Sequence, residues 1–357
     1  MSVDLYPDVN ELSGHSLCAL PGMTIGGRQA YVFSSFAQET VEKHFEWMET
    51  YGIDGALLQR FVGEIAPARA EGDVVLRNVM ASAQDHSRVF AVEYDLSGSH
   101  ADTVLRQLQD DWTYLTETVR VTASPAYLKL QGKPVVSLWG LGFAGKGDHI
   151  VDPKLAAAII QWFHNVAHVK VMGGTPSGWG SLSGDSVTDP EWAGVYAQLD
   201  IVQPWTVGRY GTVTQVDAWK RTHLDPDIAL AGKNHQLYMP VIFPGFSWHN
   251  LNREKPENQI PRLGGEFLWR QAYNARMSGA SIVKIAMFDE VNEGTAILKA
   301  APSRVDAPVQ GYWLTLDADG DKLPNDWDLR LAGEIGRMFR DEVHPSATVP
   351  IRPGPPW

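Results

Sequence analysis

Short apolar runs alternate along the chain with longer segments in which apolar residues recur every three or four positions. The short runs predict buried strands, and the longer periodic segments predict amphipathic helices. The predicted strands cover residues 55–61, 88–96, 133–140, 169–174, 199–204, 239–244 and 282–288. The predicted helices cover residues 39–51, 74–85, 102–118, 153–168, 216–222, 265–278 and 329–343. This order of elements predicts βα units built around a parallel sheet.

The predicted fold is α/β, a (β/α)8 TIM barrel. Seven strands are clear, and residues 31–34 (YVFS) are the one candidate for an eighth, so the first barrel strand is either short or missing. A chain of 357 residues fits one such barrel. We therefore expect a single catalytic domain over residues 1–344, followed by a Pro-rich C-terminal tail over residues 345–357.

The net charge of the chain argues against some classes of binding partner. The chain has 42 acidic and 30 basic residues, a net charge of −12, which argues against nucleic acid and anionic membranes because both need a basic face. No apolar stretch approaches the roughly 18–20 residues that span a bilayer, so membrane insertion is not expected. The N-terminal residues lack a signal-peptide pattern, although a chain whose leader had been removed would look the same and an extracytoplasmic location stays open. Oligomeric state cannot be predicted.

No metal or other cofactor is expected. The single Cys18 excludes an intramolecular disulfide and a cysteine-based metal cluster. A run of acidic residues near the C-terminus has the alternating spacing of calcium loops, but its glycine falls at the fourth position instead of the sixth. A hydrogen-bonded turn is the main interpretation of this run and calcium binding is the alternative; its members are Asp317, Asp319, Asp321, Asp326 and Asp328.

The most informative segment is residues 290–296 (EVNEGTA), which directly follow the last predicted strand. Glu290 and Glu293 would point to opposite faces if the strand continued, and they converge only if the chain turns helically. Asn292 and Gly294 favour such a turn. Paired carboxylates are what acid/base cleavage of a glycosidic bond requires. The alternative is an ordinary solvated acidic loop.

In a parallel barrel, the residues at the carboxyl ends of the strands share one face, where the active sites of this fold lie. At this face we expect the two glutamates together with acidic, basic and aromatic side chains that suit the binding of an oligosaccharide or polysaccharide. The predicted substrate-binding residues are Arg60, Glu93, Tyr94, Trp139, Trp205, Trp248 and His249.

The segment 288–295 (FDEVNEGT) resembles the E-x-x-E-G-T signature of glycoside hydrolase family 99, the endo-α-mannosidases and endo-α-mannanases, and of their family 71 relatives, the α-1,3-glucanases. Residues 51–55 (YGIDG) and 244–246 (PGF) also match, and 316–320 (LDADG) is similar to bacterial xylosidase-like members. The resemblance implies a retaining hydrolase of an α-linked glycan. It gives Glu290 the role of assisting the sugar's 2-hydroxyl and Glu293 the role of general acid/base.

The chain departs from the mannosidases between the two glutamates. Those members have an aromatic residue and a histidine there, whereas this chain has Val291 and Asn292, so the sugar is not predicted. A non-catalytic carbohydrate-binding protein on the same barrel is the alternative function. A lyase or aldolase barrel is disfavoured, because the strand ends show neither a metal triad nor a lysine placed for a Schiff base.

Overall fold

A computed structural model describes residues 2–145 and 149–354 of the chain, which divides into two compact units. Unit 1 comprises Met1–Asp54, Thr206–Arg221 and Val241–Trp357. Unit 2 comprises Gly55–Trp205 and Thr222–Pro240. We describe each unit by itself. The single catalytic domain expected over residues 1–344 stays a prediction.

Unit 2 is built on a parallel sheet in which neighbouring strands follow one another along the chain. Its order is β3 (Gly55–Phe61), β4 (Val89–Asp95), β6 (Lys133–Trp139), β7 (Lys170–Thr175), β8 (Ile201–Pro204) and β9 (Leu237–Tyr238). The short β5 (Lys129–Leu130) pairs antiparallel with β6. Residues 90–95 of β4 are all buried, which is typical of a parallel strand that is covered on both faces.

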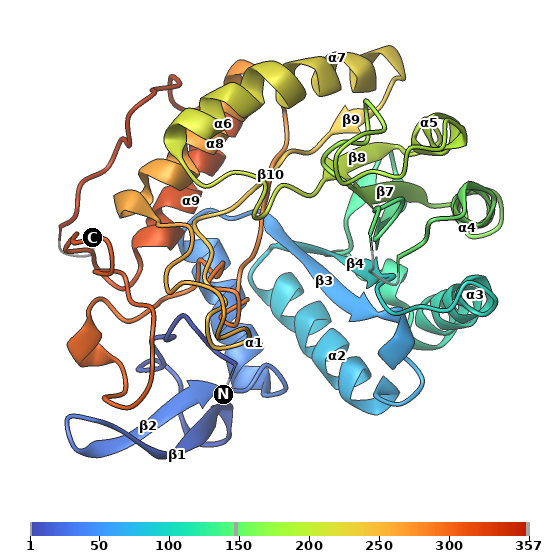
Figure 1. Ribbon diagram of the computed structural model, residues 1–357. Helices are drawn as coiled ribbons and strands as arrows, with labels where there is room; N and C mark the ends of the chain where they lie inside the picture. Colours follow the sequence, from blue (N-terminus) through green and yellow to red (C-terminus); the bar gives the residue numbers. More distant parts are fainter. Residues whose placement is uncertain (1, 146–148, 355–357) are drawn as a thin grey trace. The chain divides into compact units, whose positions relative to one another are not determined.

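Helices connect these strands. They are α2 (Arg69–Asp85), α3 (Val104–Tyr114), α4 (Pro153–Asn165), α5 (Glu191–Tyr196) and α7 (Asp225–Lys233). Figure 1 shows α2, α3, α4 and α5 along the same face of the sheet. Helix α4 begins as its sequence predicts, with Pro153 in the first turn and the Asp152 carboxylate accepting a hydrogen bond from the Lys154 amide at 2.9 Å.

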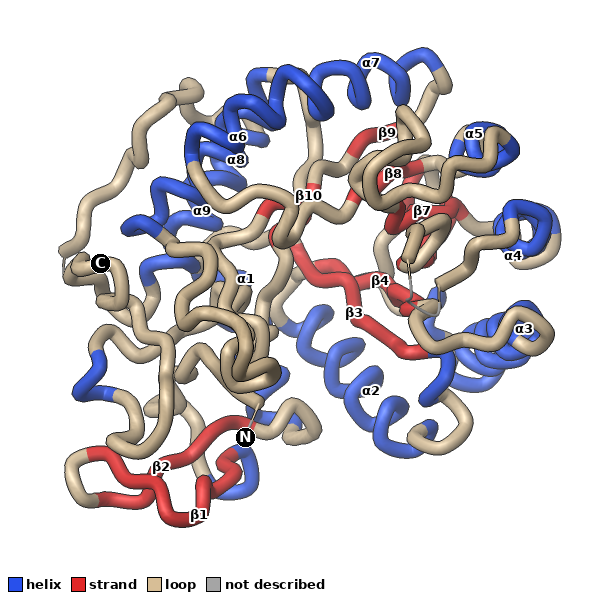
Figure 2. The backbone as a smooth tube through the Cα atoms, in the orientation of Figure 1, coloured by secondary structure: helices blue, strands red, loops and turns tan. Residues whose placement is uncertain are grey.

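Unit 1 holds the two ends of the chain and more irregular structure, which Figure 2 shows as loops. Its strands are the antiparallel pair β1 (Leu17–Ile25) and β2 (Arg28–Phe33), and the parallel pair β10 (Val241–Ile242) and β11 (Lys284–Ile285). Its helices are α1 (Gln38–Thr50), α6 (Val213–Trp219), α8 (Glu266–Met277) and α9 (Trp327–Phe339). The core between α8, α9 and the N-terminal segment contains Leu5, Trp269, Trp327 and Ile335.

The alternation of parallel strands and helices confirms the (β/α)8 class. Residues 31–33 lie in β2, which pairs antiparallel with β1 in a separate two-stranded sheet, so this run does not supply the eighth barrel strand. The predicted strand over 282–288 is also shorter than expected, because only Lys284 and Ile285 make ladder pairs before the chain bends toward the glutamates. Helices α5 and α7 were not predicted.

None of the helices in residues 2–145 and 149–354 has the length and apolar character that crossing a bilayer would need.

Candidate active site

The two glutamates lie in a tight turn that follows β11; we call residues 290–294 the glutamate turn. The chain folds back on itself here, since the Ala296 amide donates to the Glu290 carbonyl at 3.0 Å and the Met287 amide donates to the Thr295 carbonyl at 3.1 Å. Gly294 has a left-handed φ of +62°, a conformation that side chains with a Cβ rarely adopt. The predicted turn is confirmed.

The environments of the two carboxyl groups differ. One oxygen of the Glu290 carboxylate accepts the backbone N–H of Asn292 at 2.9 Å and that of Glu293 at 3.4 Å. Burial raises the pKa of Glu290, and these two hydrogen bonds oppose the rise because they stabilise the charged form. Burial raises the pKa of Glu293 to about 7, and the nearby charge of Glu290 adds to that shift. The arrangement favours one charged carboxylate beside one protonated carboxylic acid.

A second loop of unit 1 packs against the glutamate turn; we call residues 246–250, which contain Phe246, Trp248 and His249, the aromatic loop. The Ser247 amide donates to the Glu293 carbonyl at 2.8 Å. The fit is close, because a Cβ on Gly294 would lie 3.1 Å from the Ser247 nitrogen. Trp248 and His249, both predicted substrate-binding residues, are therefore carried by a loop that contacts the turn bearing the glutamates.

The polar atoms of the two aromatic residues have different surroundings. His249 Nδ1 lies 2.6 Å from the Lys255 carbonyl oxygen, which can only accept a hydrogen bond, so Nδ1 is the donor in this contact. Trp248 is half-buried and packs on Phe246 with ring centroids 5.6 Å apart. Its indole nitrogen is buried and has no hydrogen-bond acceptor among the described residues.

Arg262 holds the C-terminal side of the glutamate turn. Its Nη2 donates to the carbonyls of Gly294 at 2.7 Å and Ala296 at 2.8 Å, and its Nη1 pairs with Asp328 at the start of α9. Arg262 is 5% exposed and Asp328 is 3% exposed, so this ion pair is shielded from water. The forked guanidinium fixes two backbone carbonyls at once, which an ammonium group would do less well.

Unit 2 carries the other predicted residues at the carboxyl ends of its strands. Trp139 at the end of β6 lies edge-on to Trp205 directly after β8, with ring centroids 5.4 Å apart. Glu93 on β4 is 5% exposed and accepts hydrogen bonds from Ser137 at 2.7 Å and from Gln203 at 3.1 Å. These residues form a polar and aromatic group within unit 2.

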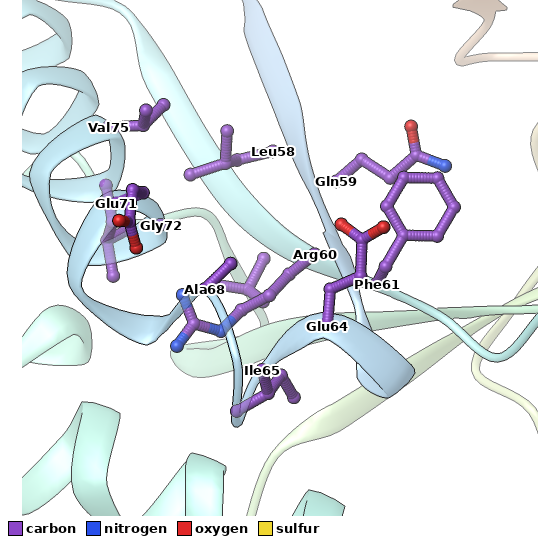
Figure 3. Close-up of a pocket in the computed structure, with 12 residues that line it drawn as sticks. Leu58, Gln59, Arg60, Phe61, Glu64, Ile65, Ala68, Glu71, Gly72 and Val75 are labelled. Carbon is purple, nitrogen blue, oxygen red and sulfur yellow. The ribbon is translucent and has the colours of Figure 1, made fainter. Parts of the chain in front are cut away.

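Arg60 and Tyr94 make different contacts from Glu93. Arg60 donates to both carboxylate oxygens of Asp111 on α3, at 2.8 and 2.9 Å, and the Tyr94 hydroxyl donates to the same carboxylate at 2.8 Å. Tyr94 is fully buried. Figure 3 shows Arg60 and its neighbour Gln59 pointing to opposite sides of β3. Arg60 and Tyr94 therefore face the helices, whereas Gln59 and Glu93, which are aligned across β3 and β4, face the other side of the sheet.

A pocket of about 250 Å³ lies on the helix-facing side of unit 2. Its walls come from β3, α2 and the turn between them, and they include Leu58, Arg60, Ile65 and Gly72 (Figure 3). Neither glutamate lines it. The carboxyl groups that do line it belong to Glu64 and Glu71, whose side chains are both exposed.

The acidic run near the C-terminus is bound by protein donors. Asp317 accepts a hydrogen bond from Thr315 at 2.6 Å, and Asp319 accepts one from Asn258 at 2.7 Å and another from the Leu263 amide at 2.8 Å. The predicted hydrogen-bonded turn accounts for both carboxylates. Over residues 2–145 and 149–354, no group of three or more His, Cys, Asp or Glu side chains is placed to hold a metal ion.

Two residues near the glutamates, Asp4 and Arg262, were not found from the sequence, and a third, Asp328, was named only as a member of the acidic run. Each acts through contacts that span more than 30 positions of the chain. Asp4, for example, is hydrogen-bonded to residues 243 to 246 positions away. No local spacing or motif could have identified these partners.

Comparison with known proteins identifies the fold. No protein-family model matches the chain, and no curated protein matches it. Among solved structures, the GH99 endo-α-mannosidase from Bacteroides thetaiotaomicron superposes with a TM-score of 0.69 over 96% of this chain and 90% of that chain, at 14% identity. The chain shares the fold of a GH99 endo-α-mannosidase.

Two further solved structures support the same fold class. A "glycoside hydrolase-like protein" matches with a TM-score of 0.60 at 15% identity, over 85% of this chain and 87% of that one. GH5_18 from Streptomyces cattleya, solved with GlcNAc, matches with a TM-score of 0.52 at 12% identity, over 86% and 76% of the two chains. The predicted likeness to family 99 is confirmed at the level of the fold.

Proposed function

We propose that this protein is a retaining glycoside hydrolase that cleaves an α-linked glycan, with Glu290 and Glu293 as its catalytic residues and without a cofactor. The observation that carries the proposal is the unequal pair of carboxyls in the glutamate turn. Burial and the charge of Glu290 raise the pKa of Glu293 to about 7, while backbone N–H groups stabilise the charged form of Glu290. The GH99-like fold supports the same conclusion.

The unequal environments favour one assignment of roles. A general acid must hold its proton near neutral pH, which fits Glu293. A base must be ionised, which fits Glu290, whose carboxylate accepts two backbone hydrogen bonds. The family resemblance gives the two residues the same roles.

The proposed reaction has two steps. In the first, Glu290 takes the proton of the sugar's 2-hydroxyl, the freed oxygen attacks the anomeric carbon to form a 1,2-anhydro sugar, and Glu293 gives its proton to the departing glycosidic oxygen. In the second, the Glu293 carboxylate takes a proton from water, whose oxygen attacks the anomeric carbon and opens the three-membered ring. The 2-oxygen then recovers its proton from Glu290. Two inversions at one carbon give net retention.

We also propose substrate-binding roles for the aromatic and polar residues at the strand ends. In unit 1 these are Trp248 and His249, whose loop contacts the glutamate turn. In unit 2 they are Glu93, Trp139 and Trp205. Indole rings suit the apolar faces of sugar rings, and carboxylates accept hydrogen bonds from sugar hydroxyls. A binding role for Arg60 and Tyr94 stays a prediction. Their polar groups already donate hydrogen bonds to Asp111, so we do not include them in the proposed substrate-binding set.

The sugar has to be found by experiment. The backbone N–H of Asn292 donates to the Glu290 carboxylate, so this residue between the glutamates contributes to the site through its main chain. Wild-type protein should be incubated with α-mannans, α-glucans and xylose-containing oligosaccharides, with NMR reporting the anomer first released. We expect hydrolysis of one of these classes with retention.

Two variants test the catalytic residues. Glu290→Gln and Glu293→Gln should each lower kcat by at least about a hundredfold, the usual contribution of a general acid or base. Glu191→Gln, on the exposed side of α5, is the matched control and should keep wild-type activity. Full activity in both glutamate variants would refute the assignment. Tight binding of an oligosaccharide without turnover would instead favour the non-catalytic alternative.

A further inference from the structure

We propose that Asp4 is a positioning residue that holds the aromatic loop against the glutamate turn. The positioning role is argued from the hydrogen bonds of Asp4, and only its expected effect on KM rests on the proposed function. Asp4 lies in the N-terminal segment, for which the sequence predicted no functional residue. Its side chain is fully buried.

The Asp4 carboxylate fixes the backbone on both sides of Trp248. One oxygen accepts the Ser247 hydroxyl at 2.6 Å and the His249 amide at 2.8 Å, and the other accepts the Asn250 amide at 2.7 Å. Three donors from four consecutive residues converge on one carboxylate. A loop held in this way presents Trp248 and His249 in a single conformation.

The same residue reaches the glutamate turn through its main chain. The amides of Asp4 and Leu5 both donate to the carbonyl of Val291, at 3.1 and 3.0 Å. Val291 lies between the two glutamates. Asp4 therefore connects the segment that carries Glu290 and Glu293 with the loop that carries the proposed sugar-binding aromatics.

The chemistry explains why this residue is an aspartate. No Lys or Arg in the described part of the chain forms an ion pair with Asp4, so its charge is balanced by N–H and O–H donors alone. Two carboxylate oxygens can accept all three hydrogen bonds, whereas an asparagine amide would turn an NH2 group toward one set of donors. Charge-assisted hydrogen bonds of this kind are stronger than neutral ones and preorganise the groups they hold.

The test compares three variants. Asp4→Asn removes the carboxylate, and Ser247→Ala removes one of its three donors and is the milder change. Asp8→Asn is the matched control, because Asp8 lies in the same segment but accepts hydrogen bonds from Asn10 and Asn325 instead of the aromatic loop. Each variant is measured in the full chain for its thermal unfolding midpoint, its KM and kcat, and its amide hydrogen exchange.

We expect Asp4→Asn to raise KM about tenfold or more while kcat changes less than about threefold, the signature of lost substrate binding. Ser247→Ala should move KM in the same direction by a smaller factor, and Asp8→Asn should leave it unchanged. Hydrogen exchange should quicken in residues 247–250 for Asp4→Asn but not for Asp8→Asn. A change in unfolding midpoint that is the same for Asp4→Asn and Asp8→Asn, without a change in KM, would overturn the proposal.

The proposal and the function can fail separately. If the glutamate variants abolish turnover while Asp4→Asn behaves as wild type, only the role of Asp4 is refuted. If wild-type protein cleaves none of the α-glycans, the hydrogen-exchange comparison still decides: unchanged exchange in residues 247–250 of Asp4→Asn refutes the positioning role, and faster exchange supports it.

Discussion

Two residues of the same type have different environments here because their hydrogen-bond partners differ. Glu290 and Glu293 are both half-buried, but only the Glu290 carboxylate accepts backbone N–H groups. Burial without such compensation raises the pKa of Glu293 to about 7. A glutamic acid with an ordinary pKa would be ionised at neutral pH and could not donate a proton. In the proposed function, this difference in hydrogen bonding is why Glu293, and not Glu290, is assigned the role of the acid.

These environments predict a bell-shaped dependence of kcat/KM on pH. Activity should fall on the alkaline side with a midpoint near pH 7, as Glu293 loses the proton that it must donate. It should fall on the acid side as Glu290 becomes protonated, and the raised pKa of Glu290 places that limb above the range of an ordinary glutamate. Initial rates on the cleaved glycan from pH 4 to pH 9 test this. An alkaline limb absent below pH 9 would exclude Glu293 as the acid.

The glutamates could be predicted from the sequence because the turn that joins them is local. The strand-end residues show where such reasoning stops. Side chains alternate between the two faces of a strand, so Glu93 and Tyr94 cannot both point the same way. Both residues were predicted to bind substrate at the carboxyl-end face of the barrel. The Tyr94 and Arg60 side chains contact Asp111, whereas the Glu93 side chain contacts Ser137 and Gln203. In the sheet, Gln59 is paired with Glu93 and Arg60 with Tyr94, so the first pair and the second pair point to opposite faces of the strands.

At the scale of elements, the glutamate turn is held at both ends by groups that come from distant segments. The N-terminal backbone binds Val291, and Arg262 binds the carbonyls of Gly294 and Ala296. The strand β11 that precedes the turn has only two ladder residues. The turn is therefore held by groups from distant segments as well as by the short strand that precedes it.

The anchor at Arg262 gives a prediction about stability. Replacing Arg262 with methionine should lower the free energy of unfolding by roughly 3–5 kcal/mol, because Asp328 is left buried and unpaired. Arg337→Met is the matched control; Arg337 pairs with Glu334 on the surface of α9, and its loss should cost about 1 kcal/mol or less. Urea unfolding at 25 °C measures both. Equal, small losses would show that the buried pair does not anchor the turn.

At the scale of the whole molecule, the periodicity of the sequence was enough to predict the fold class, but not enough to locate every strand and helix. The seven predicted helices are all present, because each has an apolar face that must be buried. Residues 31–34 were the one candidate for the eighth strand, with a missing strand as the alternative, and residues 31–33 pair antiparallel with β1 instead; a short apolar run does not reveal whether its partner is parallel or antiparallel. Helix α5 has only six residues, too few for a clear period. At 14% identity, the likeness to a GH99 endo-α-mannosidase is visible in the fold.

The most direct measurement is an NMR titration of the carboxyl carbons of ¹³C-labelled glutamate in wild type and in Glu290→Gln. The account predicts that Glu293 titrates near pH 7 in the wild type and at lower pH in the variant, because the charge of Glu290 is one of the two causes of its shift. The opposite result is a Glu293 that titrates near 4.5, the ordinary value for a glutamate, in both proteins. That outcome would contradict the division of roles on which the proposed function depends.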